Sequence, residues 1–167
     1  MMYYLDIETT GVNELVDKII TIQYMALDEN SGKPAGQLKI LKEWDDVSDE
    51  KTILKKFIEV FVPEKEWAFV PVGYNLNFEH KFFLQRCKAN ELKSIDILNG
   101  PFLDLKAIGV LMNNGSFTGS GLDKLTNKQS DGRVIPDWYK EKKYEEIESY
   151  IKNETQAYTE FCAFCYA

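Results

Sequence analysis

Hydrophobic and polar positions in the first third of the chain follow the spacing of β-strands. Acidic and apolar residues alternate over residues 3–8, and a run rich in β-branched residues covers 19–27. Both patterns are typical of strands. Residues 28–36 are rich in Asp, Asn, Ser, Gly and Pro, which predicts a hairpin turn, and 37–44 return as a third strand. We therefore expect the chain to open with an antiparallel meander.

Helical spacing dominates the rest of the chain. Apolar residues recur three and four positions apart over 50–61, which predicts a helix capped by Ser48 and closed by Pro63. A fourth strand is predicted at 68–74. Further helices are predicted at 78–88 (capped by Asn75 or Asn77), at 102–112 (started by Pro101), as a short turn at 122–125, and from Trp138 to the end. Residues 113–121 and 130–132 are predicted loops.

Strands that come first, followed by alternating strands and helices, predict an α/β fold with a mixed central sheet flanked by helices. The chain has 167 residues, 44% of them hydrophobic and 13% aromatic, and it contains no repeat or long linker. We expect one domain over residues 1–167. No apolar run approaches the roughly 18 residues of a membrane helix, and no secretory signal is evident. Three cysteines are an odd count, which favours a reducing, cytoplasmic setting.

The formal net charge of −7 argues against a protein that binds nucleic acid through a basic surface. It leaves open an enzyme that acts on nucleic acid through metal ions, because such an enzyme needs a local cluster of carboxylates.

Two acids stand at the end of the first predicted strand. Asp6 and Glu8 are two residues apart, so both side chains point to one face of the sheet. Two unrelated acids on a solvent-facing edge strand would produce the same pattern. The turn formed by Thr9, Thr10 and Gly11 places them at the carboxyl end of the strand, where α/β sheets hold ligands.

Two further acids lie on predicted helices. Glu79 falls in the first turn of a helix, where the helix dipole alone would favour an acid. Tyr150 and Glu154 are four residues apart and therefore share a helix face. Each feature taken alone is ordinary.

Taken together, these motifs resemble a known family. Asp6-Ile7-Glu8-Thr9-Thr10-Gly11 resembles the first motif of the DEDD 3′–5′ exonucleases, which belong to the ribonuclease H-like superfamily. Residues 73–84, with an Asn and a Phe before Glu79, resemble the second motif. The segment from Tyr150 to Glu154 resembles the third motif of the tyrosine branch, and the resemblance covers essentially the whole chain.

The resemblance implies a ribonuclease H-like fold and hydrolysis of phosphodiester bonds from the 3′ end of single-stranded DNA or RNA, with release of nucleoside monophosphates. It implies two Mg²⁺ or Mn²⁺ ions held by Asp6, Glu8, Glu79 and Glu154, with Asp6 reaching both ions and Tyr150 orienting the attacking water. Thr9, Thr10, Gly11 and Asn75 are the implied substrate contacts.

The chain departs from the family pattern at two positions. Glu79 and Glu154 stand where the family usually has Asp, and the additional methylene moves each carboxylate by about 1.5 Å. The alternative is therefore a catalytically impaired module that keeps the fold and binds nucleic acid or a protein partner.

Overall fold

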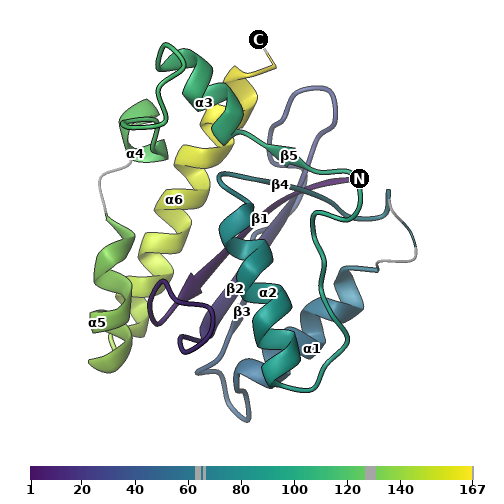
Figure 1. The fold of residues 1–167 in the computed structure, drawn as a ribbon, viewed down its shortest axis with the longest axis vertical. Coiled ribbons are helices and arrows are strands. Elements are labelled where there is room, and N and C mark those ends of the chain that lie inside the picture. The colour runs from purple at the N-terminus through teal and green to yellow at the C-terminus, as the bar shows by residue number, and fades with distance from the viewer. Residues whose placement is uncertain (63–64, 66, 127–130, 167) are drawn as a thin grey trace.

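A five-stranded mixed sheet forms the centre of the protein (Figure 1). The computed structural model describes residues 1–62, 65, 67–126 and 131–166. The strands are β1 (Met2–Thr9), β2 (Ile19–Leu27), β3 (Lys39–Lys42), β4 (Val70–Gly73) and β5 (Leu103–Asp104), in the spatial order β3-β2-β1-β4-β5. β2 pairs antiparallel with both β1 and β3, whereas β4 is parallel to β1 and β5 is parallel to β4. The predicted fold class is confirmed.

Helices cover both faces of this sheet. Helices α1 (Glu50–Val60) and α2 (Asn77–Ala89) pack on one face, and the long helix α6 (Tyr144–Phe164) packs on the other. The shorter helical segments α3 (Lys106–Met112), α4 (Leu122–Leu125), η1 (Gly132–Val134) and α5 (Ile135–Lys140) precede α6 along the chain. Among the described residues, every helix is too short or too polar to serve as a membrane span.

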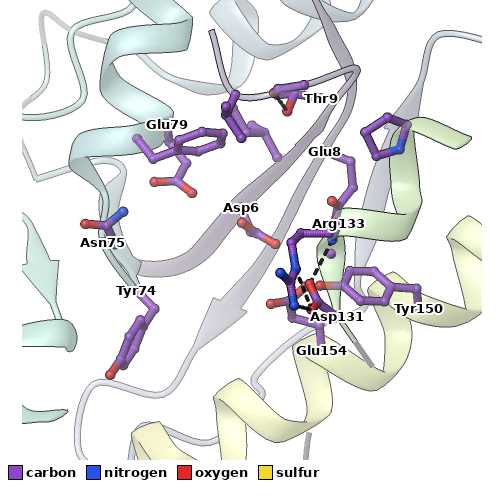
Figure 2. Close-up of a pocket in the computed structure, with 16 residues that line it drawn as sticks. Asp6, Glu8, Thr9, Tyr74, Asn75, Glu79, Asp131, Arg133, Tyr150 and Glu154 are labelled. Carbon is purple, nitrogen blue, oxygen red and sulfur yellow. Dashed lines mark hydrogen bonds and ion pairs between the residues drawn. The ribbon is translucent and has the colours of Figure 1, made fainter. Parts of the chain in front are cut away.

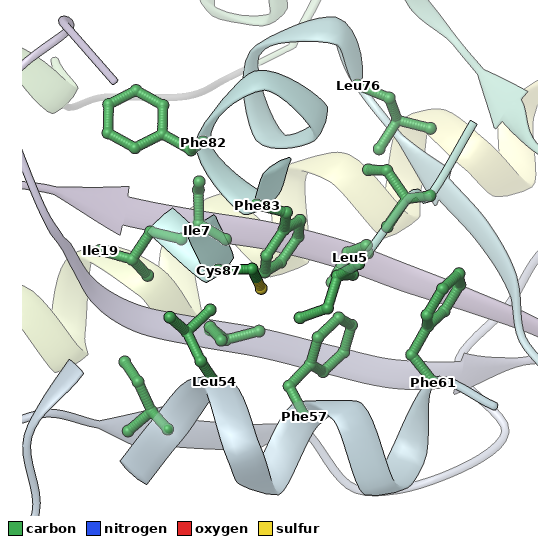
Figure 3. Packing of buried hydrophobic residues seen from close by; sticks show 14 of the residues in the cluster. Leu5, Ile7, Ile19, Leu54, Phe57, Phe61, Leu76, Phe82, Phe83 and Cys87 are labelled. Atoms are coloured by element: carbon green, nitrogen blue, oxygen red, sulfur yellow. The ribbon is translucent and has the colours of Figure 1, made fainter. Parts of the chain in front are cut away.

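The alternation of side chains along β1 assigns each residue to one of two cores. Leu5 and Ile7 pack against Phe57 of α1 and Phe83 of α2 (Figure 3). Tyr4 points to the opposite face, where its ring lies 4.8 Å from the ring of Tyr158 on α6. Because side chains two apart on a strand share a face, Asp6 and Glu8 follow Tyr4 and emerge on the side of α6.

The predicted helix over 102–112 is wrong in its first half. Leu103 pairs with Val72 and Asp104 with Gly73, so this segment begins with the edge strand β5, and the helix starts only at Lys106. Backbone pairing to β4 outweighs the local helical pattern here.

The helix predicted from Trp138 to the end is two helices in the structure. The first, α5, starts earlier than predicted, at Ile135. A turn that includes Lys142, whose φ is 57°, separates α5 from α6.

The predicted helix caps also need correction. Asp49, not Ser48, caps α1, since its carboxylate accepts a hydrogen bond from the backbone N–H of Thr52. Neither Asn75 nor Asn77 caps α2, which begins after Leu76 without a side-chain cap bond. The strands predicted at 37–44 and 68–74 are shortened to β3 and β4. Pro63 and Ser130, predicted to close a helix and to open a loop, lie outside the described residues.

Candidate active site

Three carboxylates from two distant segments meet near the carboxyl end of the central strand β1. Asp6 and Glu8 of β1 and Glu154 of α6 each offer an oxygen atom, and these oxygens lie within 4.8 Å of one another (Figure 2). The largest separation of two ligand oxygens across an octahedral Mg²⁺ is about 4.2 Å, twice its ligand distance. Small side-chain adjustments would therefore let the three acids hold one divalent ion.

The strand directions explain why the candidate residues meet at this end of the sheet. β1 and β4 are parallel, so their carboxyl ends lie at the same edge, and the segment that leads into α2 leaves from there. α6 lies on the face of the sheet opposite α2, and it carries Tyr150 and Glu154 one helical turn apart. The site therefore lies where elements from both faces of the sheet can reach it.

Glu79 lines the same pocket but lies outside the three-acid group. Its side chain is buried in the first turn of α2, and its Oε2 atom has no hydrogen-bond partner among the described residues. Burial, and then the negative charge of Asp6, raise the pKa of Glu79 well above its usual range. A buried carboxylate oxygen without a donor is suited to a cation or to water held by one.

A hydrogen-bonded turn fixes the backbone before Glu79. The Asp104 carboxylate accepts hydrogen bonds from the N–H groups of Asn75 and Leu76, at 2.8 and 3.0 Å. Asn75 has a φ of 71°, in the left-handed region, and its Oδ1 accepts a 3.1 Å hydrogen bond from Lys106 Nζ. The backbone before α2 is therefore held by the Asp104 carboxylate, whereas the sequence predicted that the side chain of Asn75 or Asn77 would cap this helix.

Tyr150 stands beside the acids with its side chain largely buried. Burial first, and then the negative charges of Glu154 and Glu8, raise the pKa of the Tyr150 hydroxyl above its usual range. The hydroxyl therefore keeps its proton at neutral pH and acts as a hydrogen-bond donor. Gly132 lies against it, since a Cβ atom at this position would come within 3.0 Å of the Tyr150 oxygen.

The pocket formed by these groups has a volume of about 360 Å³, within the range of ligand pockets. Among the predicted substrate contacts, Thr9, Gly11 and Asn75 line it. The hydroxyl of Thr10 is instead used within the loop, where it donates to Asp17 and accepts from the N–H of Lys18.

Arg133 lines the pocket as well, and sequence reasoning did not single it out. Its side chain is 90% exposed, and its guanidinium donates to the Asp131 carboxylate through Nε at 2.7 Å. Arg133 is the one Lys or Arg among the described residues that line the pocket, whereas five acids line it: Asp6, Glu8, Glu79, Asp131 and Glu154. No local motif marked Arg133, because its position depends on how the segment before α5 folds over the site.

Comparisons with solved structures find the same ribonuclease H-like fold in other proteins. Chains of exonuclease I are among those that match. An exonuclease I structure without ligand matches with a TM-score of 0.52 at 13% identity, over 66% of this chain and 30% of the other. A metal-free complex of the Escherichia coli enzyme with single-stranded DNA matches with a TM-score of 0.56 at 14% identity, over 75% and 34%. A product-bound structure matches with a TM-score of 0.52 at 15% identity, over 66% and 31%.

This chain thus spans about a third of the length of the exonuclease I chains it matches. No protein-family model matches the sequence. A search of curated proteins finds no matching relative.

Proposed function

We propose that this protein is a metal-dependent 3′–5′ exonuclease that hydrolyses phosphodiester bonds of single-stranded nucleic acid, DNA or RNA. The observation that carries the proposal is the convergence of Asp6, Glu8 and Glu154 within 4.8 Å, in the pocket that also contains Glu79 and Tyr150. Similarity in fold to exonuclease I, one structure of which is a complex with single-stranded DNA, supports the proposed substrate.

The four acids are the proposed ligands of two Mg²⁺ or Mn²⁺ ions. Asp6, Glu8 and Glu154 would hold one ion. Asp6 and the unpartnered Oε2 of Glu79 would serve the second. Such a pair of ions, when bound, activates water and stabilises the leaving oxygen of an in-line displacement. The hard carboxylate oxygens of this site suit those ions.

Tyr150 and Arg133 have separate proposed roles. The Tyr150 hydroxyl, which keeps its proton at neutral pH, would donate a hydrogen bond that orients the attacking water or a phosphate oxygen. The guanidinium of Arg133 would turn from Asp131 to a phosphate of the substrate, since bidentate pairing with phosphate oxygens suits its planar fork. A cation at this position offsets the repulsion between the phosphate and the acidic pocket.

The terminal nucleotide would lie against residues from the two loops at the sheet edge. Thr9 and Gly11 follow the first pair of acids, and Asn75 precedes Glu79. Lys106 fixes the Asn75 side chain through its Oδ1 atom. The Nδ2 donors of Asn75 therefore remain suited to a sugar or phosphate oxygen.

The test is shortening of a 5′-labelled single-stranded oligonucleotide in the presence of Mn²⁺ or Mg²⁺. We expect a ladder that starts from the 3′ end, is lost with Asp6→Asn and is blocked by a terminal phosphorothioate. Glu29→Gln, which removes an exposed acid outside the pocket, should leave the ladder unchanged. Absence of shortening by the wild-type protein with either ion would refute the proposal.

A second candidate function rests on the position of Glu79. Because Glu79 lies outside the three-acid group, the fold could bind single-stranded nucleic acid without cleaving it. Retention of the oligonucleotide by the wild-type protein, with no shortening in either metal, would favour this module over the enzyme.

A further inference from the structure

A buried glutamine lies directly behind the two carboxylates of β1. Gln23 of β2 is paired in register with Asp6, and its side chain is fully buried. Its Nε2 atom donates to Asp6 Oδ2 at 3.0 Å and to Glu8 Oε1 at 3.4 Å. One amide group therefore bridges two of the three acids that form the proposed ion site.

A second buried residue fixes the orientation of this amide. Thr21, paired in register with Glu8, is also fully buried, and its hydroxyl donates to Gln23 Oε1 at 2.9 Å. In the opposite orientation, the amide oxygen of Gln23 would face two carboxylates and be repelled by both. The network therefore sets which end of the amide faces the acids.

The chemistry of this arrangement is specific to holding carboxylates. A polar side chain at a fully buried sheet position is costly unless its groups are hydrogen-bonded, and an apolar residue of similar size would pack there without that cost. Two carboxylates with oxygens this close repel each other, and a shared N–H₂ donor reduces that repulsion. The donor also restricts the rotation of both acids before an ion arrives.

We infer that Gln23 is a positioning residue for the metal ligands, oriented by Thr21, and that it sets the affinity of the site for divalent cations. This inference rests on the proposed metal-dependent function and adds a role for β2, a strand that contributes no ligand. Removal of hydrogen-bonding partners of metal ligands typically lowers metal affinity by about 10- to 100-fold.

The test is a titration of Mn²⁺ into the metal-free protein. Binding is measured by calorimetry and, independently, by the electron paramagnetic resonance signal of free Mn²⁺. Gln23→Leu, which keeps the side-chain size and removes the donors, should weaken Mn²⁺ binding by about 10- to 100-fold. Thr21→Val, which leaves Gln23 in place but frees its amide to rotate, should give a smaller loss. This second variant also keeps the test informative if Gln23→Leu does not fold.

The controls separate this inference from the proposed function. Met25→Leu changes a buried residue on the same face of β2, two positions from Gln23, and should bind Mn²⁺ like the wild type. If the wild type binds Mn²⁺ and the Gln23 and Thr21 variants bind it equally tightly, the positioning role is overturned while the proposed function stands. If the wild type binds no Mn²⁺, the proposed function fails and this inference fails with it.

Discussion

The buried carboxylate of Glu79, whose Oε2 has no hydrogen-bond partner in the described part of the chain, predicts that the metal-free protein loses stability as the pH rises. Burial and the charge of Asp6 raise the pKa of Glu79 in the folded protein, so the folded state binds this proton more tightly than the unfolded chain does. The contribution of such a group to the free energy of unfolding is fully present below its unfolded pKa of about 4.3 and is lost as the pH rises through the folded pKa. Glu79→Gln removes the titration and keeps the shape.

The size of the effect follows from the burial of Glu79. Glu79 is 5% exposed and its Oε2 has no hydrogen-bond partner in the described part of the chain, so ionisation places a buried charge partly on an oxygen without a donor. An unsatisfied buried polar group costs about 1–3 kcal/mol, and more when it is charged. We therefore expect Glu79→Gln to raise the free energy of unfolding at pH 8 by about 3 kcal/mol, the upper end of this range, because the group that it replaces is charged. Each kcal/mol corresponds to about 2–4 °C in melting temperature for a chain of this length.

Thermal unfolding in the presence of a chelator, from pH 4.5 to pH 8, measures this effect. The difference between Glu79→Gln and wild type should be small at the acidic end and should grow as the pH rises. Glu91→Gln, which alters an exposed acid after the end of α2, is the matched control and should show no such growth. A difference for Glu79→Gln that is constant across the pH range would refute the reasoning.

Three further predictions address the pocket and its support. Tyr150→Phe keeps the ring packed beside Ile147 and Ile151 and removes the hydroxyl; we expect kcat to fall by about 10- to 100-fold, measured on a labelled oligonucleotide. Arg133→Ala removes an exposed side chain, so stability should not change, whereas kcat/KM should fall about tenfold and recover in part with Arg133→Lys. Arg86→Met breaks the bidentate pair with the buried Glu50 carboxylate, and urea unfolding should show a loss of about 3 kcal/mol.

Local periodicity was sufficient to predict which residues of the candidate site share a face of a regular element. The two-residue period of β1 places Asp6 and Glu8 on one face, and the four-residue spacing places Tyr150 and Glu154 on one face of α6. The meander of β1, β2 and β3 followed from β-branched runs and from the turn residues between them.

The residues that support the site could not be predicted in this way. Asp104 acts from a two-residue edge strand, which is too short to show a period, and its role depends on its pairing beside β4. Gln23 and Thr21 belong to a run that reads only as a strand, and their role depends on register with β1. Arg133 has no distinguishing neighbours in the sequence. In each case the information lies in contacts between segments that are distant along the chain.

The position of the site gives divalent ions a structural role as well as the proposed chemical one. Glu79 is carried by α2 on one face of the sheet, and Glu154 by α6 on the other, while Asp6 lies between them on β1 (Figure 2). In the metal-free protein these acids repel one another across the sheet edge, and Gln23 relieves only the pair on β1. Ions held by all four acids would replace that repulsion with attraction and join both helical layers to the central strand. A ligand that binds only the folded state stabilises it by mass action, so the same carboxylates that weaken the metal-free fold would strengthen it when ions are bound.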